Sequence, residues 1–168
     1  MQKTHSILLI FCSCFLQATL AIDTKPIWAV DTVGVTFGES AEDAKSYQLT
    51  LRKENTNWVE SFGIPLRKYG ITSHWDINLF EWRLDSESSY GLSTNLSFTY
   101  EFETLKVGAL TPFVEFGTGF GFLSETNIGT LDMASSFQFM NQLAAGLKTE
   151  NFAILFMASH FVLISDKH

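Results

Sequence analysis

Apolar and polar side chains alternate with a period of two along most of the chain beyond residue 25, which is the pattern of β-strands with two unlike faces. The alternating segments are residues 33–37, 47–52, 75–79, 92–102, 112–122, 137–148 and, with the least regular phase, 152–163. No segment past residue 25 has a convincing helical period. The sequence therefore predicts an all-β protein, a meander of about seven strands joined by turns.

The two faces of the 112–122 segment indicate which side of the predicted sheet meets lipid. One face carries Val114, Phe116, Phe120 and Phe122, and the other carries Glu115, Gly117, Gly119 and Gly121. A soluble barrel of the lipocalin kind places its large apolar residues inside, whereas a membrane barrel turns them outward to lipid. Three glycines beside a glutamate fit a narrow polar lumen, so we predict a small antiparallel outer-membrane β-barrel.

Single-chain bacterial barrels of this kind have an even number of strands, from eight upward. The segments that alternate number about seven, and the end of the chain after residue 163 is polar, so the final strand is expected to be missing. An undetected strand near residues 58–66 is the alternative.

The first 21 residues have the layout of a secretory signal peptide. Lys3 supplies the positive start, residues 7–15 are apolar, and the sequence 18–21 ends in a small-residue cleavage site. The apolar run is too short for a transmembrane helix, which needs about 20 residues. We therefore expect residues 1–21 to be a signal peptide and residues 22–168 to be a barrel domain that lacks the final strand. Both cysteines, Cys12 and Cys14, lie in the leader, so the mature protein has no thiol or disulfide chemistry.

The charge of the chain excludes one class of partner. The net charge is −7 with no basic cluster, and a protein that binds nucleic acid needs cations to neutralise phosphates. No residue pattern implies a cofactor, and no carboxylates or histidines have the spacing of metal ligands. The expected location is the outer membrane of a Gram-negative-type bacterium, and nothing in the sequence sets an oligomeric state.

Two carboxylates are expected in the lumen of the predicted barrel. Glu101 and Glu115 fall on the polar faces of their segments, and we expect Lys148 or Arg83 to pair with them. His74, which opens the 75–79 segment, is expected to lie at an interface or to cap the strand.

His160 is the candidate functional residue. It shares its strand phase with Phe152, Ile154 and Phe156, which places an ionisable imidazole on the lipid-facing side. An interfacial histidine is one interpretation, and a base that acts on a lipid substrate is the other. No serine nucleophile shares this face next to His160.

Three stretches of the chain resemble the lipid A 3-O-deacylases, small outer-membrane barrels that hydrolyse an ester-linked acyl chain of lipopolysaccharide. The stretches are residues 96–102, 111–126 and 135–148. In that family a histidine, an aromatic residue, a serine and an asparagine follow one another at the end of the seventh strand, and the eighth strand carries a glutamate. The resemblance implies a triad on the outer wall, with His160 as base, and lipid A acyl chains as the substrate.

The chain departs from the family motif after Phe161. Val162 stands in place of the serine and Leu163 in place of the asparagine, and the chain ends before the glutamate. We therefore expect the protein to be inactive as a deacylase, and a truncated or frameshifted gene product is the simplest explanation. Two alternatives stay open: a non-enzymatic small outer-membrane barrel and a soluble lipid-carrying barrel.

Overall fold

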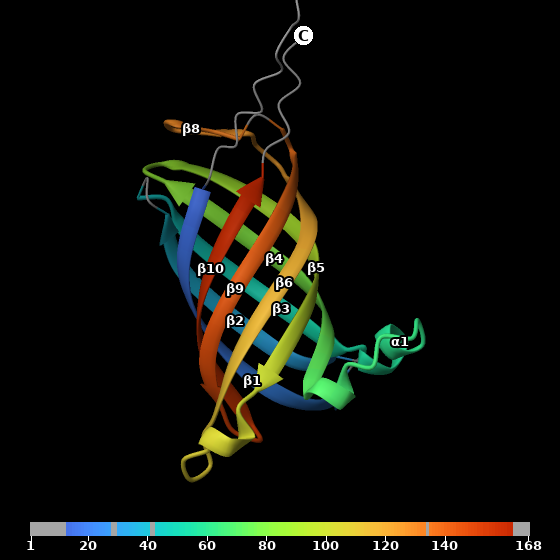
Figure 1. Cartoon of the computed structure of the whole chain (residues 1–168). Coiled ribbons are helices and arrows are strands. Elements are labelled where there is room, and N and C mark those ends of the chain that lie inside the picture. The colour runs from blue at the N-terminus through green and yellow to red at the C-terminus, as the bar shows by residue number, and fades with distance from the viewer. Residues whose placement is uncertain (1–12, 28–29, 41–42, 134, 163–168) are drawn as a thin grey trace, which may run out of the picture.

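The computed structural model describes residues 13–27, 30–40, 43–133 and 135–162, and it is a closed antiparallel barrel (Figure 1). Around the barrel the strands follow the order β1-β10-β9-β6-β5-β4-β3-β2. Their bounds are β1 Ser13–Ile27, β2 Val30–Ser40, β3 Lys45–Glu54, β4 Ile71–Leu84, β5 Glu87–Glu101, β6 Thr111–Leu123, β9 Phe137–Lys148 and β10 Phe152–Val162. A short hairpin, β7 Asn127–Ile128 and β8 Leu131–Asp132, lies over one end of the barrel.

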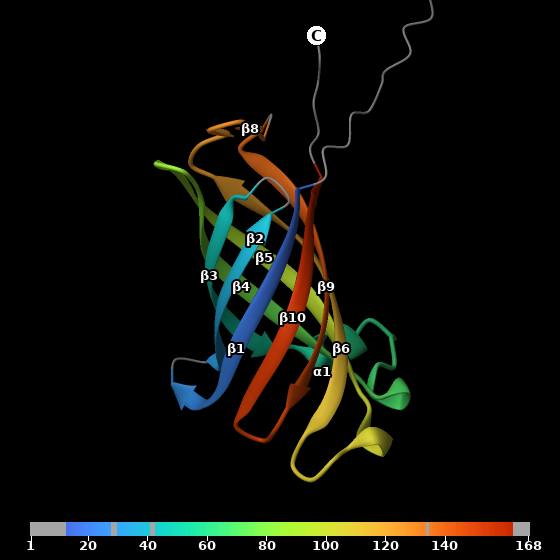
Figure 2. The ribbon, with the colours of Figure 1, turned by 90° about the vertical axis from the view of Figure 1, so that its left-hand side faces the viewer.

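The prediction of an antiparallel barrel is confirmed, and the count of seven strands is wrong. The eighth strand is β1, which pairs antiparallel with β10 on one side and with β2 on the other (Figure 2). The sequence pattern misses β1 because residues 13–21 have the composition of a leader and fall within the predicted signal peptide. The alternative strand near residues 58–66 is also wrong, because that segment contains part of the helix α1 Thr56–Glu60.

The signal peptide prediction stays a prediction, and it has a structural consequence. Residues 13–21 form more than half of β1, so cleavage after Ala21 would remove the part of β1 that pairs with β10 from Phe161 to Ala153. The barrel would then lose closure at the seam between β10 and β2.

The faces of the strands agree with the alternation read from the sequence. Phe116, Phe120 and Phe122 point outward and are 44–53% exposed, while Glu115 on the same strand is buried in the lumen. Glycine is required where two strands approach closely, since a Cβ at Gly119 would lie 2.0 Å from the carbonyl oxygen of Thr94. The glycine face of β6 therefore lines the lumen, as predicted.

The lumen is filled, so the barrel is not a pore. Near the end that carries β7 and β8, an apolar cluster closes it; its members are Ala44, Phe80, Trp82, Leu84, Leu123, Ile128, Met133 and Met140. Toward the other end a smaller cluster forms from Phe113, Ala144, Leu155 and Met157. Polar side chains occupy the middle.

The connection from β3 to β4 carries α1 and the 3₁₀ helix η1, Arg67–Tyr69, which project sideways from the wall in Figure 1. The ring of Trp58 lies 5.6 Å from that of Trp75 on the outward face of β4. The backbone N–H of Arg67 donates to Glu60 at 2.8 Å, and this bond keeps the pKa of Glu60 below its ordinary value. A further 3₁₀ helix, η2 Glu103–Leu105, follows β5. No helix in the described part of the chain is long and apolar enough to cross a membrane.

A disulfide tests whether β1 closes the barrel. Ala21 and Ala153 are partners in the β1–β10 register, so cysteines at both positions lie within reach of a cross-strand bridge. We expect the variant A21C/A153C, made with Cys12 and Cys14 replaced by serine, to form the bridge when the full chain folds. Mass spectrometry of a peptide digest detects it.

The control is L20C/A153C, because neighbouring residues of a strand point to opposite faces and cannot both reach the same partner. A folded A21C/A153C protein with two free thiols would contradict closure by β1. Recovery of a folded protein whose first residue is Ile22 would instead support the signal peptide.

Candidate functional site

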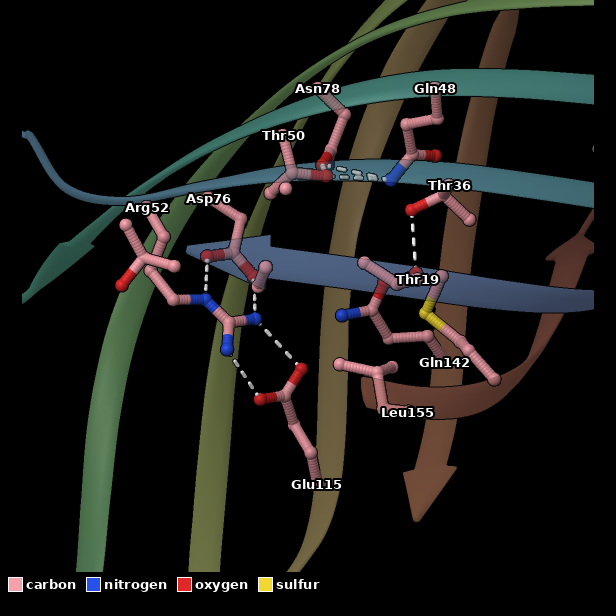
Figure 3. Close-up of a pocket in the computed structure, with 14 residues that line it drawn as sticks. Thr19, Thr36, Gln48, Thr50, Arg52, Asp76, Asn78, Glu115, Gln142 and Leu155 are labelled. Atoms are coloured by element: carbon pink, nitrogen blue, oxygen red, sulfur yellow. Dashed lines mark hydrogen bonds and ion pairs between the residues drawn. The ribbon is translucent and has the colours of Figure 1, made fainter. Parts of the chain in front are cut away.

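Arg52 is the centre of a network of ion pairs in the lumen (Figure 3). Its Nε and Nη2 donate to the carboxylate of Asp76 at 2.7 and 2.8 Å, and its Nη1 and Nη2 donate to that of Glu115 at 2.7 and 2.8 Å. Ser97 donates to Asp76 at 2.7 Å and Thr99 donates to Glu115 at 2.9 Å. Both carboxylates are almost fully buried, and each is paired with the same guanidinium away from solvent.

Amides and hydroxyls continue this network along the lumen. Asn78 accepts from Thr50 at 2.8 Å and from Gln48 at 3.0 Å, and Gln142 links Asn95 to Ser97. The cavity that remains among these side chains has a volume of about 40 Å³ (Figure 3). That space suits water and is too small for an acyl chain.

The lumen carboxylates correct part of the expected pairing. Lys148 pairs with Glu101 at 2.8 Å, as expected. Arg83 is not a lumen cation, because it points outward and pairs with Glu81 on its own strand at 2.7 Å. Arg52 takes its place at Glu115, because even-numbered residues of β3 face the lumen.

His74 also differs from its expected place. It lines a lower cavity of the lumen together with Arg52 and Glu115, rather than lying at an interface or capping a strand. The 71–84 strand begins three residues before His74, so this imidazole lies within β4 and takes the inward phase of its neighbours.

His160 lies on the outer wall, as its phase predicts. Phe156 and Ile154 lie on the same face of β10 as His160, and their side chains are 65% and 48% exposed. The Nε2 atom of His160 is buried and has no hydrogen-bond partner among the described residues. His160 therefore places a half-buried imidazole, one nitrogen of which is unpaired, on the outer wall.

Two further polar residues lie in the same row of the barrel as His160. Asn141 of β9 is its register partner, and Thr118 of β6 is the register partner of Asn141. The Thr118 hydroxyl donates to Oδ1 of Asn141 at 2.9 Å. We call Thr118, Asn141 and His160 the polar row.

Apolar rows border the polar row. On one side Phe116 pairs with Leu143 and Leu143 with Ala158, and on the other Phe120 pairs with Phe139. The exposed Phe116, Phe120, Phe139 and Leu143 make this region of the wall suited to hydrocarbon. The hydrogen-bonding groups on this part of the wall are thus confined to the polar row, with apolar rows on both sides. A lipid has the same arrangement where a polar linkage lies between apolar chains.

Comparison with known proteins identifies the family. The sequence model of the lipid A 3-O-deacylase (PagL) family matches residues 45–161, from the start of β3 to the position after His160. The chain belongs to the lipid A 3-O-deacylase family. It is 28% identical over 140 residues to the lipid A deacylase PagL of Pseudomonas aeruginosa, and the matched region covers 81% of this chain and 75% of that protein.

A solved structure shows the same fold. The crystal structure of the outer membrane enzyme PagL aligns with a TM-score of 0.55 at 19% sequence identity, over 88% of this chain and 99% of that one. Family membership and an eight-stranded barrel are thus both observed.

The sequence pattern identifies His160 but not Thr118 or Asn141. A signal for both is present, because each interrupts a series of outward apolar residues in its strand. Thr118 stands between Phe116 and Phe120, and Asn141 stands between Phe139 and Leu143. Among the described residues, no group of three or more His, Cys, Asp and Glu side chains converges as a metal site would require.

Replacing Arg52 with alanine tests the role of the lumen network. The substitution leaves Asp76 and Glu115 buried without their cation, so we expect it to destabilise the barrel by about 3–5 kcal/mol. Urea unfolding of the protein folded in detergent measures the change. The control is Lys53→Ala on the same strand, whose pair with Asp31 is exposed and contributes at most about 1 kcal/mol. Equal stability of the two variants would contradict a structural role for the network.

Proposed function

We propose that this protein is an outer-membrane barrel that binds lipid A acyl chains on its outer wall around the polar row and does not hydrolyse their ester. The observation that carries the proposal is the polar row itself, which lies between apolar rows in a member of the lipid A 3-O-deacylase family. Polar groups that face lipid are costly, and they are retained in membrane proteins where function needs them. The resemblance to the family indicates what they bind.

His160 is the residue that the family motif assigns as the general base. The unpaired imidazole of His160 is the group that we expect to hydrogen-bond an ester or hydroxyl group of the lipid. Asn141 and Thr118 supply further donors and acceptors in the same row. We assign these three residues to recognition of the polar linkage, and the flanking Phe116 and Phe139 to contact with the chains.

Hydrolysis needs a nucleophile that this site lacks. Val162 of β10 stands at the serine position of the motif, and a valine side chain cannot attack an ester. Leu163 stands at the position of the asparagine that helps hold the oxyanion in the family. Removing the nucleophile of a serine-protease triad lowers kcat by about 10⁶-fold, so binding without turnover is the expected behaviour.

A lipid A assay tests binding and hydrolysis separately. We expect the full chain, folded in detergent, to retain lipid A and to release no acyl chain above the protein-free level, as measured by mass spectrometry. His160→Ala and Asn141→Leu should each weaken lipid A retention, because hydrogen bonds to the linkage are lost. Release of an acyl chain by the unmodified protein would overturn the absence of turnover.

Restoring the motif tests the assignment of His160. V162S/L163N restores the nucleophile but not the acid that orients the histidine. Loss of that acid lowers the rate of a triad less than loss of the nucleophile does, so we expect the variant to release acyl chains about 10²-fold faster than the unmodified chain. The matched control, H160A in the V162S/L163N background, should return to the starting rate.

A longer variant completes the family motif. It lacks residues 1–21 and continues after Phe161 with serine, asparagine, a turn and a strand that carries glutamate. Because the added strand would occupy the slot of β1, we expect it to be more active than V162S/L163N. A folded, inactive protein would contradict the proposed site.

A further inference from the structure

The outer wall across the barrel from His160 has its own groove. β4 is separated from β10 by the same number of strands in either direction around the barrel. The groove spans β2 to β5 and has a volume of about 420 Å³. Its lining includes Phe37, Tyr47, Leu49, Leu79, Glu81 and Tyr90. A site of this volume is within the range of pockets that hold small ligands, and this one opens toward lipid.

The register of β2 to β5 arranges the outward residues of this wall in three layers, counted along the strands from the middle of the barrel toward the strand ends. The inner layer is aliphatic and consists of Val35, Leu49, Leu79 and Leu92. The middle layer is mainly aromatic and consists of Phe37, Tyr47, Glu81 and Tyr90. The outer layer, next to the strand ends, consists of Glu39, Lys45, Arg83 and Ser88. A membrane has the same order from its centre outward: hydrocarbon, then the interface, then the lipid headgroups.

Two cations of the outer layer are direct neighbours. Lys45 and Arg83 are register partners on β3 and β4, and their side chains point to the same outer face. Like charges opposite one another in a sheet are destabilising unless an anion lies between them. Glu81 reduces this repulsion only in part. Its carboxylate accepts hydrogen bonds from Nε of Arg83 at 3.2 Å and from Nη2 at 2.7 Å, and it forms no ion pair with Lys45.

One guanidinium nitrogen and the ammonium group stay available. Nη1 of Arg83 has no bond to Glu81, and Lys45 forms no ion pair with any described residue, although Glu39 is its register partner on β2. Arg83 is held in place above the groove, with its guanidinium carbon 5.8 Å from the ring centre of Tyr47. A fixed arginine beside a lysine is a suitable pair of donors for a phosphate.

We propose that this wall is a second lipid site, in which the groove holds an acyl chain and Lys45 and Arg83 bind the phosphate of that lipid. The neighbouring cations Lys45 and Arg83 and their position above an apolar groove both indicate a phosphorylated lipid. The inference rests on the location of the barrel in a membrane, and it requires neither binding nor hydrolysis at His160.

Lipid retention by the full chain tests the proposal. The protein is folded in a non-ionic detergent and mixed with phosphatidic acid or with diacylglycerol of the same chains, and native mass spectrometry measures the lipid that stays bound. We expect phosphatidic acid to be retained at least about tenfold more than diacylglycerol, since only the former offers charge-assisted bonds to the two cations. Equal retention of the two lipids would overturn the role of the phosphate.

Three variants locate the site. K45A/R83A removes the cations and should lower phosphatidic acid retention about tenfold, because the charge-assisted bonds are lost. Leu79→Trp fills the groove with the cations unchanged, and it should lower retention to a similar extent. Lys106→Ala is the matched control, because Lys106 is an exposed lysine next to η2, near the opposite end of the barrel, and its removal should have no effect. Retention by K45A/R83A or by Leu79→Trp equal to that of the unmodified protein would overturn the proposal.

Discussion

The pairing of every backbone N–H and C=O group is the constraint on which this structure depends. In hydrocarbon no water is present to satisfy an open strand edge, so a sheet that spans a membrane must close on itself. Here closure occurs where β1 joins β10 to β2, two strands that would otherwise each present a free edge. The seam is therefore the most consequential contact in the fold, and it is formed by the segment whose composition is that of a leader.

Closure of a narrow barrel determines what the lumen contains. The glycine face of β6 lets the strands approach, and Gln142 and Ser93 fill the space that side chains at Gly117 and Gly121 would need. Arg52, Asp76 and Glu115 then share a small interior in which each charge has a partner. Together with the apolar clusters toward each end, this network makes the interior a packed core.

The outer wall presents two different environments to lipid. Around β6, β9 and β10, hydrogen-bonding groups lie in one row among apolar residues, which suits a polar linkage within a lipid. Around β3 and β4, charged groups lie at the strand ends above aromatic and aliphatic layers, which suits a lipid headgroup. We assign a proposed lipid to each of these environments, in a member of a family named for hydrolysis.

The sequence by itself determined the fold class, the orientation of the faces and the place of His160, because a period of two assigns each side chain of a strand to one side. Phe116, Glu115 and His160 all lie on the predicted faces. The partners of those residues were decided by the tertiary structure alone. Register brings Asn141 and Thr118 beside His160 and Asp76 beside Arg52 on neighbouring strands. Closure of the barrel brings Glu115 of β6 across the lumen to Arg52 of β3. Closure by β1 could likewise not be read from local patterns. A segment with the composition of a leader pairs as a strand only where open strand edges are present, here those of β10 and β2.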